Sequence, residues 1–183
     1  MTRGPSGRGL RAAASVRAPR VLDARQARAV ALDLLSRKAW ARRELSSRLC
    51  RRGAPADLAE SVVADLEARG YVDDRSFATN WAEARARRLG SLRLRDELTR
   101  KGIARPLVEQ AVRGAFAEAD ELTRARQAAR RRWPLLQRST PAQAARRLHD
   151  HLARRGYPAS VVRQVVRETC RLTTDDLDEV DDE

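Results

Sequence analysis

The sequence predicts an all-α protein, an elongated array of three tandem three-helix repeats whose units are helix-turn-helix-like. The first observation is a motif that occurs three times without a gap, over residues 45–63, 94–112 and 148–166. A repeat with a period of about 50 residues is typical of stacked helical units. The second is that apolar residues recur at helical spacing before each copy, and the third is that no stretch alternates with period two.

Each copy of the motif predicts one helix, a glycine turn and a second helix. Two leucines at i and i+4 place an apolar stripe on the first helix, and a basic pair then precedes the glycine. Glycine is favoured just after a helix because that position prefers positive φ. These features stand at Leu45, Leu49, Arg51, Arg52 and Gly53; at Leu94, Leu98, Arg100, Lys101 and Gly102; and at Leu148, Leu152, Arg154, Arg155 and Gly156. The second helices close on apolar residues: Leu58, Val62 and Val63; Leu107, Ala111 and Val112; Val161, Val165 and Val166.

Another amphipathic segment precedes each copy and predicts the remaining helix of each unit. The core-facing residues expected there are Ala27, Val30, Ala31, Leu34 and Leu35 within residues 24–38; Phe77, Trp81, Ala84 and Arg88 before the second copy; and Leu122, Ala125, Ala129 and Trp133 within residues 119–133.

Local signals place the ends of several of these helices. Asp73 and Asp74 are expected to cap the helix before the second copy. Pro134 is expected to end the helix of residues 119–133, because proline clashes with the preceding turn. Thr140 and Gln143 form the pattern of a capping box that starts the next helix.

These elements divide the chain into three repeats between two tails. The repeats are expected at residues 23–70, 71–118 and 119–173. Residues 1–22 contain arginine but no acid and predict a disordered basic tail, without the apolar segment of a secretory signal. Residues 174–183 predict a disordered acidic tail, which either aids solubility or competes with nucleic acid for a basic surface.

Composition indicates a polyanionic partner. The chain of 183 residues has a net charge of +13 and 38 basic residues, of which only Lys38 and Lys101 are lysine. A GC-rich coding bias accounts for most of the arginine excess over lysine, but it does not account for the net charge. Each basic pair before a glycine has two explanations, because positive charge there also stabilises the end of a helix. Three pairs in register favour a shared basic surface.

The sequence contains no recognisable catalytic, cofactor-binding or metal-binding motif, so we expect no catalytic residues, no cofactor and no metal. Cys50 and Cys170 stand alone, and His149 and His151 lie two residues apart without other metal ligands near them. No phosphate-binding glycine loop or nucleophile motif occurs, and no apolar run is long enough to span a bilayer. We therefore expect a cytoplasmic protein that is not an enzyme.

Over residues 24–170 the sequence resembles the RecX family of recombination regulators. The family's G-x-x-D-D-x-x-F-A signature is matched at Gly70, Asp73, Asp74, Phe77 and Ala78. Its E-L-x-x-x-L-x-x-[KR]-G element is matched at Glu44, Leu45, Leu49, Arg52 and Gly53, and its L-x-x-K-G-I element at Leu98, Lys101, Gly102 and Ile103. Two residues depart from the family pattern: Ala41 replaces a Ser or Thr helix cap, and Trp81 replaces a more common Tyr.

The resemblance implies a negative modulator of the RecA recombinase, acting in homologous recombination, DNA repair and the SOS response. Such a protein binds the RecA–single-stranded-DNA filament and inhibits its extension, its ATPase and strand exchange, and we expect it to be a monomer. The alternatives are a direct DNA-binding regulator of the helix-turn-helix type and a helical scaffold whose charge serves solubility. The candidate RecA- or DNA-binding residues are the basic pairs before the repeated glycines and the arginines clustered near the ends of the preceding helices. They are Arg51, Arg52, Arg85, Arg87, Arg88, Arg100, Lys101, Arg130, Arg131, Arg132, Arg154 and Arg155.

Overall fold

The structure, a computed structural model, describes residues 21–117 and 120–178, and within them it is helical with no strand. The helices are α1 (Ala24–Arg37), α2 (Arg42–Arg51), α3 (Ala56–Ala68), α4 (Asp74–Ala86), α5 (Ser91–Arg100), α6 (Arg105–Ala115), α7 (Glu121–Arg132), α8 (Pro141–Arg154) and α9 (Ala159–Asp178), with a 3-10 turn, η1 (Trp133–Leu135), after α7. The predicted all-α fold is confirmed.

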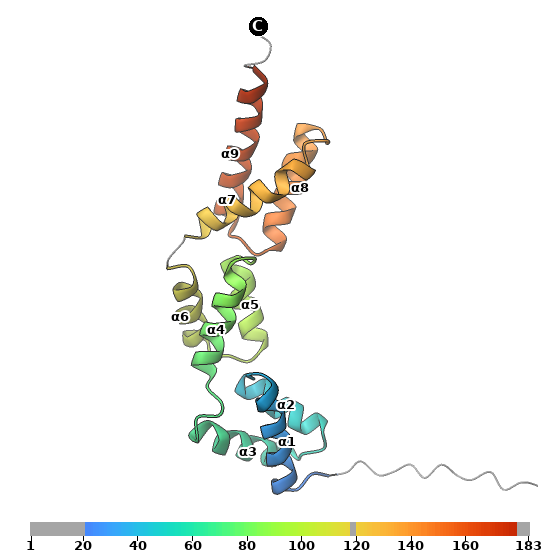
Figure 1. Cartoon of the computed structure of the whole chain (residues 1–183), viewed down its shortest axis with the longest axis vertical. Coiled ribbons are helices and arrows are strands. Elements are labelled where there is room, and N and C mark those ends of the chain that lie inside the picture. Colours follow the sequence, from blue (N-terminus) through green and yellow to red (C-terminus); the bar gives the residue numbers. More distant parts are fainter. Residues whose placement is uncertain (1–20, 118–119, 179–183) are drawn as a thin grey trace, which may run out of the picture.

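The helices form three units that stack end to end into a curved column (Figure 1). Unit 1 contains α1–α3, unit 2 contains α4–α6 and unit 3 contains α7–α9, and the principal helix contacts lie within units. Each unit has its own apolar cluster. The motif leucines form the centre of each cluster and are fully buried: Leu45, Leu49, Leu94, Leu98, Leu148 and Leu152.

The repeated glycines end their helices in the left-handed conformation, as predicted. The φ angles are +99° at Gly53, +83° at Gly102 and +81° at Gly156. Gly70 has a φ of +76° and ends α3 in the same way, although it lies outside the repeated motif. An L-residue at such a position carries a steric penalty of roughly 1–2 kcal/mol, which explains why glycine recurs there.

The expected core face of α4 is partly wrong. Phe77 is buried and Trp81 is partly buried, but Ala84 and Arg88 are exposed. The buried face is instead completed by Ala78, Ala82 and Ala86, three small residues that let α4 pack closely on α6.

The predicted helix starts are confirmed at Asp73 and Thr140, with two differences: Asp74 does not cap α4 but bonds the Arg42 N–H, and α8 lacks a complete capping box. The Asp73 carboxylate caps α4 by accepting hydrogen bonds from the backbone N–H groups of Arg75 and Ser76. The Thr140 hydroxyl accepts from the Gln143 backbone N–H, while the returning bond that would complete a capping box is seen among the described residues only at α1, between Asp23 and Gln26.

The last helix of the array is longer than the sequence predicted. Helix α9 continues to Asp178, into the segment for which we expected an acidic tail. The prediction of a disordered acidic tail is therefore wrong for residues 174–178, while its remainder, residues 179–183, and residues 1–20 of the predicted basic tail lie outside the described residues. No helix of the described chain is long and apolar enough to cross a membrane.

Candidate nucleic-acid interface

The candidate interface depends on how neighbouring units meet, and the junction of units 2 and 3 is made by backbone hydrogen bonds. The Gly90 N–H donates to the Arg155 carbonyl at 2.8 Å, and the Leu92 N–H donates to the Gly156 carbonyl at 3.0 Å. The Ser91 N–H donates to the Glu121 carboxylate at 2.6 Å. These bonds fix the start of α5 against the turn between α8 and α9.

The junction of units 1 and 2 is made by side chains. The Lys101 ammonium lies 2.9 Å from the Glu44 carboxylate, and the Asp74 carboxylate accepts a hydrogen bond from the Arg42 N–H. Ala41, which precedes α2, is fully buried in the core of unit 2. The turn glycine Gly102 lies directly against the side chain of Arg43.

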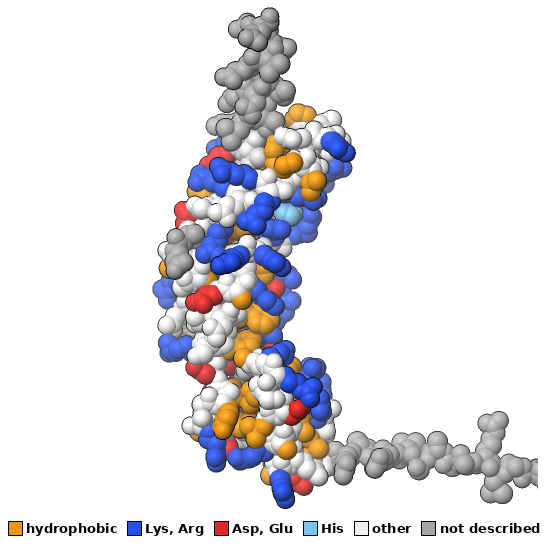
Figure 2. Space-filling view, in the orientation of Figure 1, with side chains coloured by type: hydrophobic (Ala, Val, Ile, Leu, Met, Phe, Trp, Pro, Cys, Tyr) orange, Lys and Arg blue, Asp and Glu red, His pale blue; other side chains and the backbone are white. Residues whose placement is uncertain are grey.

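Basic side chains are abundant on the concave side of the column, where a histidine lies among them at the level of units 2 and 3 (Figure 2). At this junction an open pocket of about 430 Å³ has a strongly basic lining. The segment after α4 contributes Arg87 and Arg88, and α7, η1, α8 and the residue after α8 contribute the rest. The lining residues are Arg87, Arg88, Ala128, Arg131, Arg132, Leu135, His151 and Arg155.

The pocket has no matching negative charge near its arginines. Within residues 21–117 and 120–170, no carboxylate lies within ion-pair distance (4.0 Å) of any of the five arginines, although eleven pairs of Arg or Lys with Asp or Glu form elsewhere. Partial burial lowers the pKa of His151, and the charges of Arg155, Arg132 and Arg154 lower it further. The histidine is therefore neutral at pH 7, and the site has an excess of positive charge that favours an anion.

Five of the twelve predicted interface residues thus come together in one pocket: Arg87, Arg88, Arg131, Arg132 and Arg155. Four others are exposed outside this pocket: Arg51 and Arg52 at the end of α2, Arg130 on α7 and Arg154 at the end of α8.

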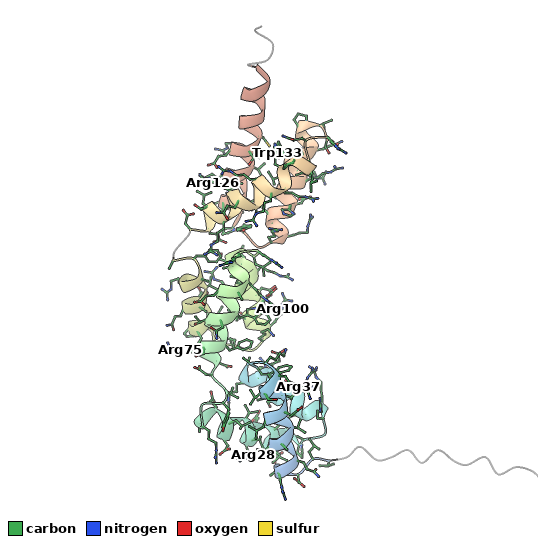
Figure 3. All side chains as sticks on the ribbon, viewed as in Figure 1. Arg28, Arg37, Arg75, Arg100, Arg126 and Trp133 are labelled. Carbon is green, nitrogen blue, oxygen red and sulfur yellow. The ribbon has the colours of Figure 1, made fainter. Side chains whose placement is uncertain are left out.

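The remaining three predicted residues make contacts within the protein. Lys101 bonds Glu44 and lies 4.1 Å from the centre of the Trp81 ring, and Arg85 contacts the same ring at 3.7 Å and pairs with Glu97. Arg100 pairs with Asp96 one turn earlier in α5. Figure 3 places Arg100 beside α5, with Arg75 across the column.

Both lysines of the chain, Lys38 and Lys101, contact aromatic rings. Lys38 and Lys101 both line a pocket of about 240 Å³ between units 1 and 2, together with Phe77, Asn80 and Trp81. Lys38 lies 3.8 Å from the centre of the Trp40 ring. Each lysine is thus held by a cation–π contact within its own unit, Lys38 with Trp40 in unit 1 and Lys101 with Trp81 in unit 2.

Sequence reasoning missed His151 and Leu135 as part of the interface. His151 lies one helical turn before Arg155, so the two side chains share a face of α8, and that spacing was a usable signal. Leu135 is 67% exposed and gave no signal, because its position depends on the turn after α7.

Comparison with known proteins agrees with this architecture at each of the three units. The family models for the first, second and third three-helix domains of RecX match residues 27–66, 73–112 and 118–166, respectively. The chain belongs to the RecX family. The regulatory protein RecX of Mycobacterium ulcerans is 40% identical over 146 residues, which cover 77% of this chain and 83% of that protein. The RecX protein of Thermobifida fusca is 39% identical and covers 82% of each chain.

Solved RecX structures share the fold. The crystal structure of RecX from Lactobacillus salivarius superposes with a TM-score of 0.68 at 14% identity, covering 79% of this chain and 95% of that one. A second RecX crystal structure has a TM-score of 0.71 at 18% identity and covers 78% of this chain and 72% of that one. The RecX relatives are regulatory proteins by name, so a regulatory role is shared by this chain.

Proposed function

We propose that this RecX-family chain is a negative modulator of the RecA recombinase. In this proposal it binds the RecA–single-stranded-DNA filament as a monomer in the cytoplasm and inhibits filament extension, ATP hydrolysis and strand exchange. It does so without a catalytic step or a cofactor. Membership of the RecX family over all three units is the observation that carries the proposal.

The shape and charge of the molecule support this function. A curved column of three units presents basic side chains along its concave side (Figure 2), which suits a long polyanionic filament better than a compact ligand. Because the pocket arginines have no carboxylate partners within residues 21–117 and 120–170, their charge is available to a phosphate or to an acidic protein surface.

Titration of the purified chain into a RecA ATPase assay with single-stranded DNA tests the proposal. We expect the hydrolysis rate to fall at near-stoichiometric or lower ratios of this chain to RecA. A variant with Arg131→Glu and Arg132→Glu should inhibit less while keeping its helical circular dichroism. An unchanged ATPase rate with folded protein would contradict the function.

The alternative is a DNA-binding regulator that acts without RecA, since three-helix units of this kind also occur in helix-turn-helix proteins. The two functions differ in their preferred partner. Retention on immobilised RecA filaments, but not on duplex DNA of any sequence tested, would support the RecA modulator. Tight binding to one duplex sequence would support the alternative.

A further inference from the structure

The basic pocket between units 2 and 3 has the properties of a specific binding site. Its volume of about 430 Å³ falls within the range of about 300–1,000 Å³ typical of small-ligand sites. Five arginines converge on it from elements far apart in the sequence, and their guanidinium groups suit the oxygens of a phosphate.

Backbone hydrogen bonds of the junction fix the positions of the chain segments that line the pocket. Arg155 lines the pocket with its side chain, while its backbone carbonyl accepts the Gly90 N–H at 2.8 Å. Arg87 and Arg88 come just before Gly90 in the chain. A Cβ atom at Gly90 would lie 2.5 Å from the Tyr157 nitrogen, so glycine allows the two units to meet this closely.

Two further features indicate what kind of phosphate compound fits. Leu135 lines the pocket and is 67% exposed, so it offers an apolar surface beside the charges. An unpaired base can contact this leucine or stack on an arginine guanidinium while its phosphate bonds the other arginines, whereas the bases of a duplex are stacked inside the helix. The pocket is also concave, and a flexible single strand can bend its backbone into it.

We propose that this pocket binds the phosphodiester backbone of single-stranded nucleic acid, with units 2 and 3 both contributing contacts and His151 adding a further donor when it is protonated. The choice of nucleic acid as the partner rests on the proposed function, but the site itself acts without RecA. The charged groups around His151 are Arg132 and Arg131 from α7, Arg154 and Arg155 from α8, and Arg87 and Arg88 after α4.

A bound phosphate reverses the electrostatics around His151. In the free protein, burial and the surrounding arginines hold its pKa below the ordinary value. A phosphate anion favours the protonated imidazolium and raises that pKa again. Binding therefore takes up a proton, so the affinity for nucleic acid increases as the pH falls through the range in which His151 titrates.

The site can be tested with the full chain and a fluorescent oligo(dT) strand, in the absence of RecA. The double variant Arg132→Gln with Arg155→Gln should weaken binding by roughly tenfold or more, as expected when charge-assisted bonds are removed. It should also reduce the salt slope by roughly 0.7 for each phosphate that the variant no longer neutralises. The matched control is Arg105→Gln with Arg113→Gln, which removes the same charge from exposed positions outside the pocket. Equally weakened binding in the two double variants would overturn the proposal.

The two histidines of the chain provide an independent measurement by NMR. The oligonucleotide should raise the pKa of His151, whereas the ring-proton signals of His149 should move little on binding, because His149 is exposed beside Asp150 and does not line the pocket. His151→Gln should abolish the increase in affinity at acidic pH, while His149→Gln should retain it. A His151 signal that does not respond to saturating oligo(dT) would overturn the site.

Two competitors identify the source of the phosphate. Inorganic phosphate and a nucleoside monophosphate share the anion but lack the linked backbone, so each should compete only at far higher concentration than unlabelled oligo(dT). If either binds as tightly as the strand, the pocket is a small-anion site and the assignment to nucleic acid is wrong. Because none of these measurements contains RecA, their failure is distinct from a failure to inhibit the RecA ATPase.

Discussion

The Asp74 carboxylate of unit 2 accepts a hydrogen bond from the Arg42 backbone N–H at 2.8 Å and so caps the first turn of α2 in unit 1. The N-cap position of α2 is Ala41, whose side chain makes no capping bond. Ala41 is instead fully buried in the core of unit 2. The missing hydroxyl is thus compensated by a carboxylate from the neighbouring unit, and the cap holds the two units together.

Replacing this cap should destabilise the junction of units 1 and 2. Asp74→Ala leaves the Arg42 N–H without its acceptor, and we expect the free energy of unfolding to fall by about 1 kcal/mol, the usual cost of removing a cap. Urea unfolding measures the change. Asp74→Asn keeps an acceptor oxygen and should be much less destabilised. If Asp74→Ala and Asp74→Asn are equally stable, the bond contributes nothing to the fold.

The sequence predicted the units well, because each one is specified locally. The leucines at i and i+4 and the following glycine are short-range signals, and all six leucines are buried as expected. The face of α4 was harder to predict, because Phe77 and Trp81 suggested a stripe that continued to Ala84 and Arg88. Trp81 is only partly buried and is held by Arg85 and Lys101, so it does not mark the centre of the core.

The junctions could not be predicted, because they join residues far apart in the sequence through the backbone. Nothing in the residues around Gly90 indicates that its N–H bonds the Arg155 carbonyl. The repeated motif grouped Arg155 with Arg52 and Lys101, its equivalents in the other two copies. The structure groups Arg155 with Arg87 and Arg132 instead. Position within a repeat therefore did not determine which charges meet.

Three glycine substitutions should separate backbone strain from junction contacts. Gly70→Ala meets no atom within 4 Å and should cost only the penalty of its positive φ, roughly 1–2 kcal/mol. Gly90→Ala has an ordinary φ of −84° but clashes with the Gly156 turn, so it should open the junction of units 2 and 3. Gly156→Ala carries both costs, since its Cβ would lie 2.9 Å from the Arg93 Cα.

Hydrogen exchange at the Leu92 amide distinguishes these outcomes, because that amide donates to the Gly156 carbonyl across the junction. Its exchange should accelerate in Gly90→Ala and Gly156→Ala and stay unchanged in Gly70→Ala. Slow exchange of Leu92 in Gly90→Ala would show that the junction absorbs the added methyl group.

Damage to one core should remain within its unit. Leu49 and Leu152 are fully buried in separate clusters, and replacing either with alanine should cost roughly 2–5 kcal/mol. Limited proteolysis with mass spectrometry should find new cleavage in unit 1 for Leu49→Ala and in unit 3 for Leu152→Ala. Cleavage throughout the chain in both variants would mean that the three units unfold together.

Acid should weaken unit 3 through one ion pair. Arg126 on α7 makes two hydrogen bonds of 2.8 Å to Glu168 on α9. These bonds, followed by one from Gln164, lower the pKa of Glu168 from 4.5 to about 2. In the unfolded chain the carboxyl group titrates near its ordinary value, so between these two pKa values the unfolded state binds more protons than the folded state.

The contribution of Glu168 to stability should therefore be fully present above about pH 5 and should disappear as the pH falls toward 2. Thermal unfolding of the full chain across this range measures it. Arg126→Gln removes the cause of the lowered pKa, so its melting temperature should decrease less steeply with acid than that of the unmodified chain. Arg130→Gln is the matched control, because Arg130 lies one turn later on α7, with no carboxylate of residues 21–117 and 120–170 in ion-pair distance, and it should retain the full acid dependence. Parallel curves for all three proteins would mean that solvent screens the pair and that α7 and α9 are held together by their apolar contacts alone.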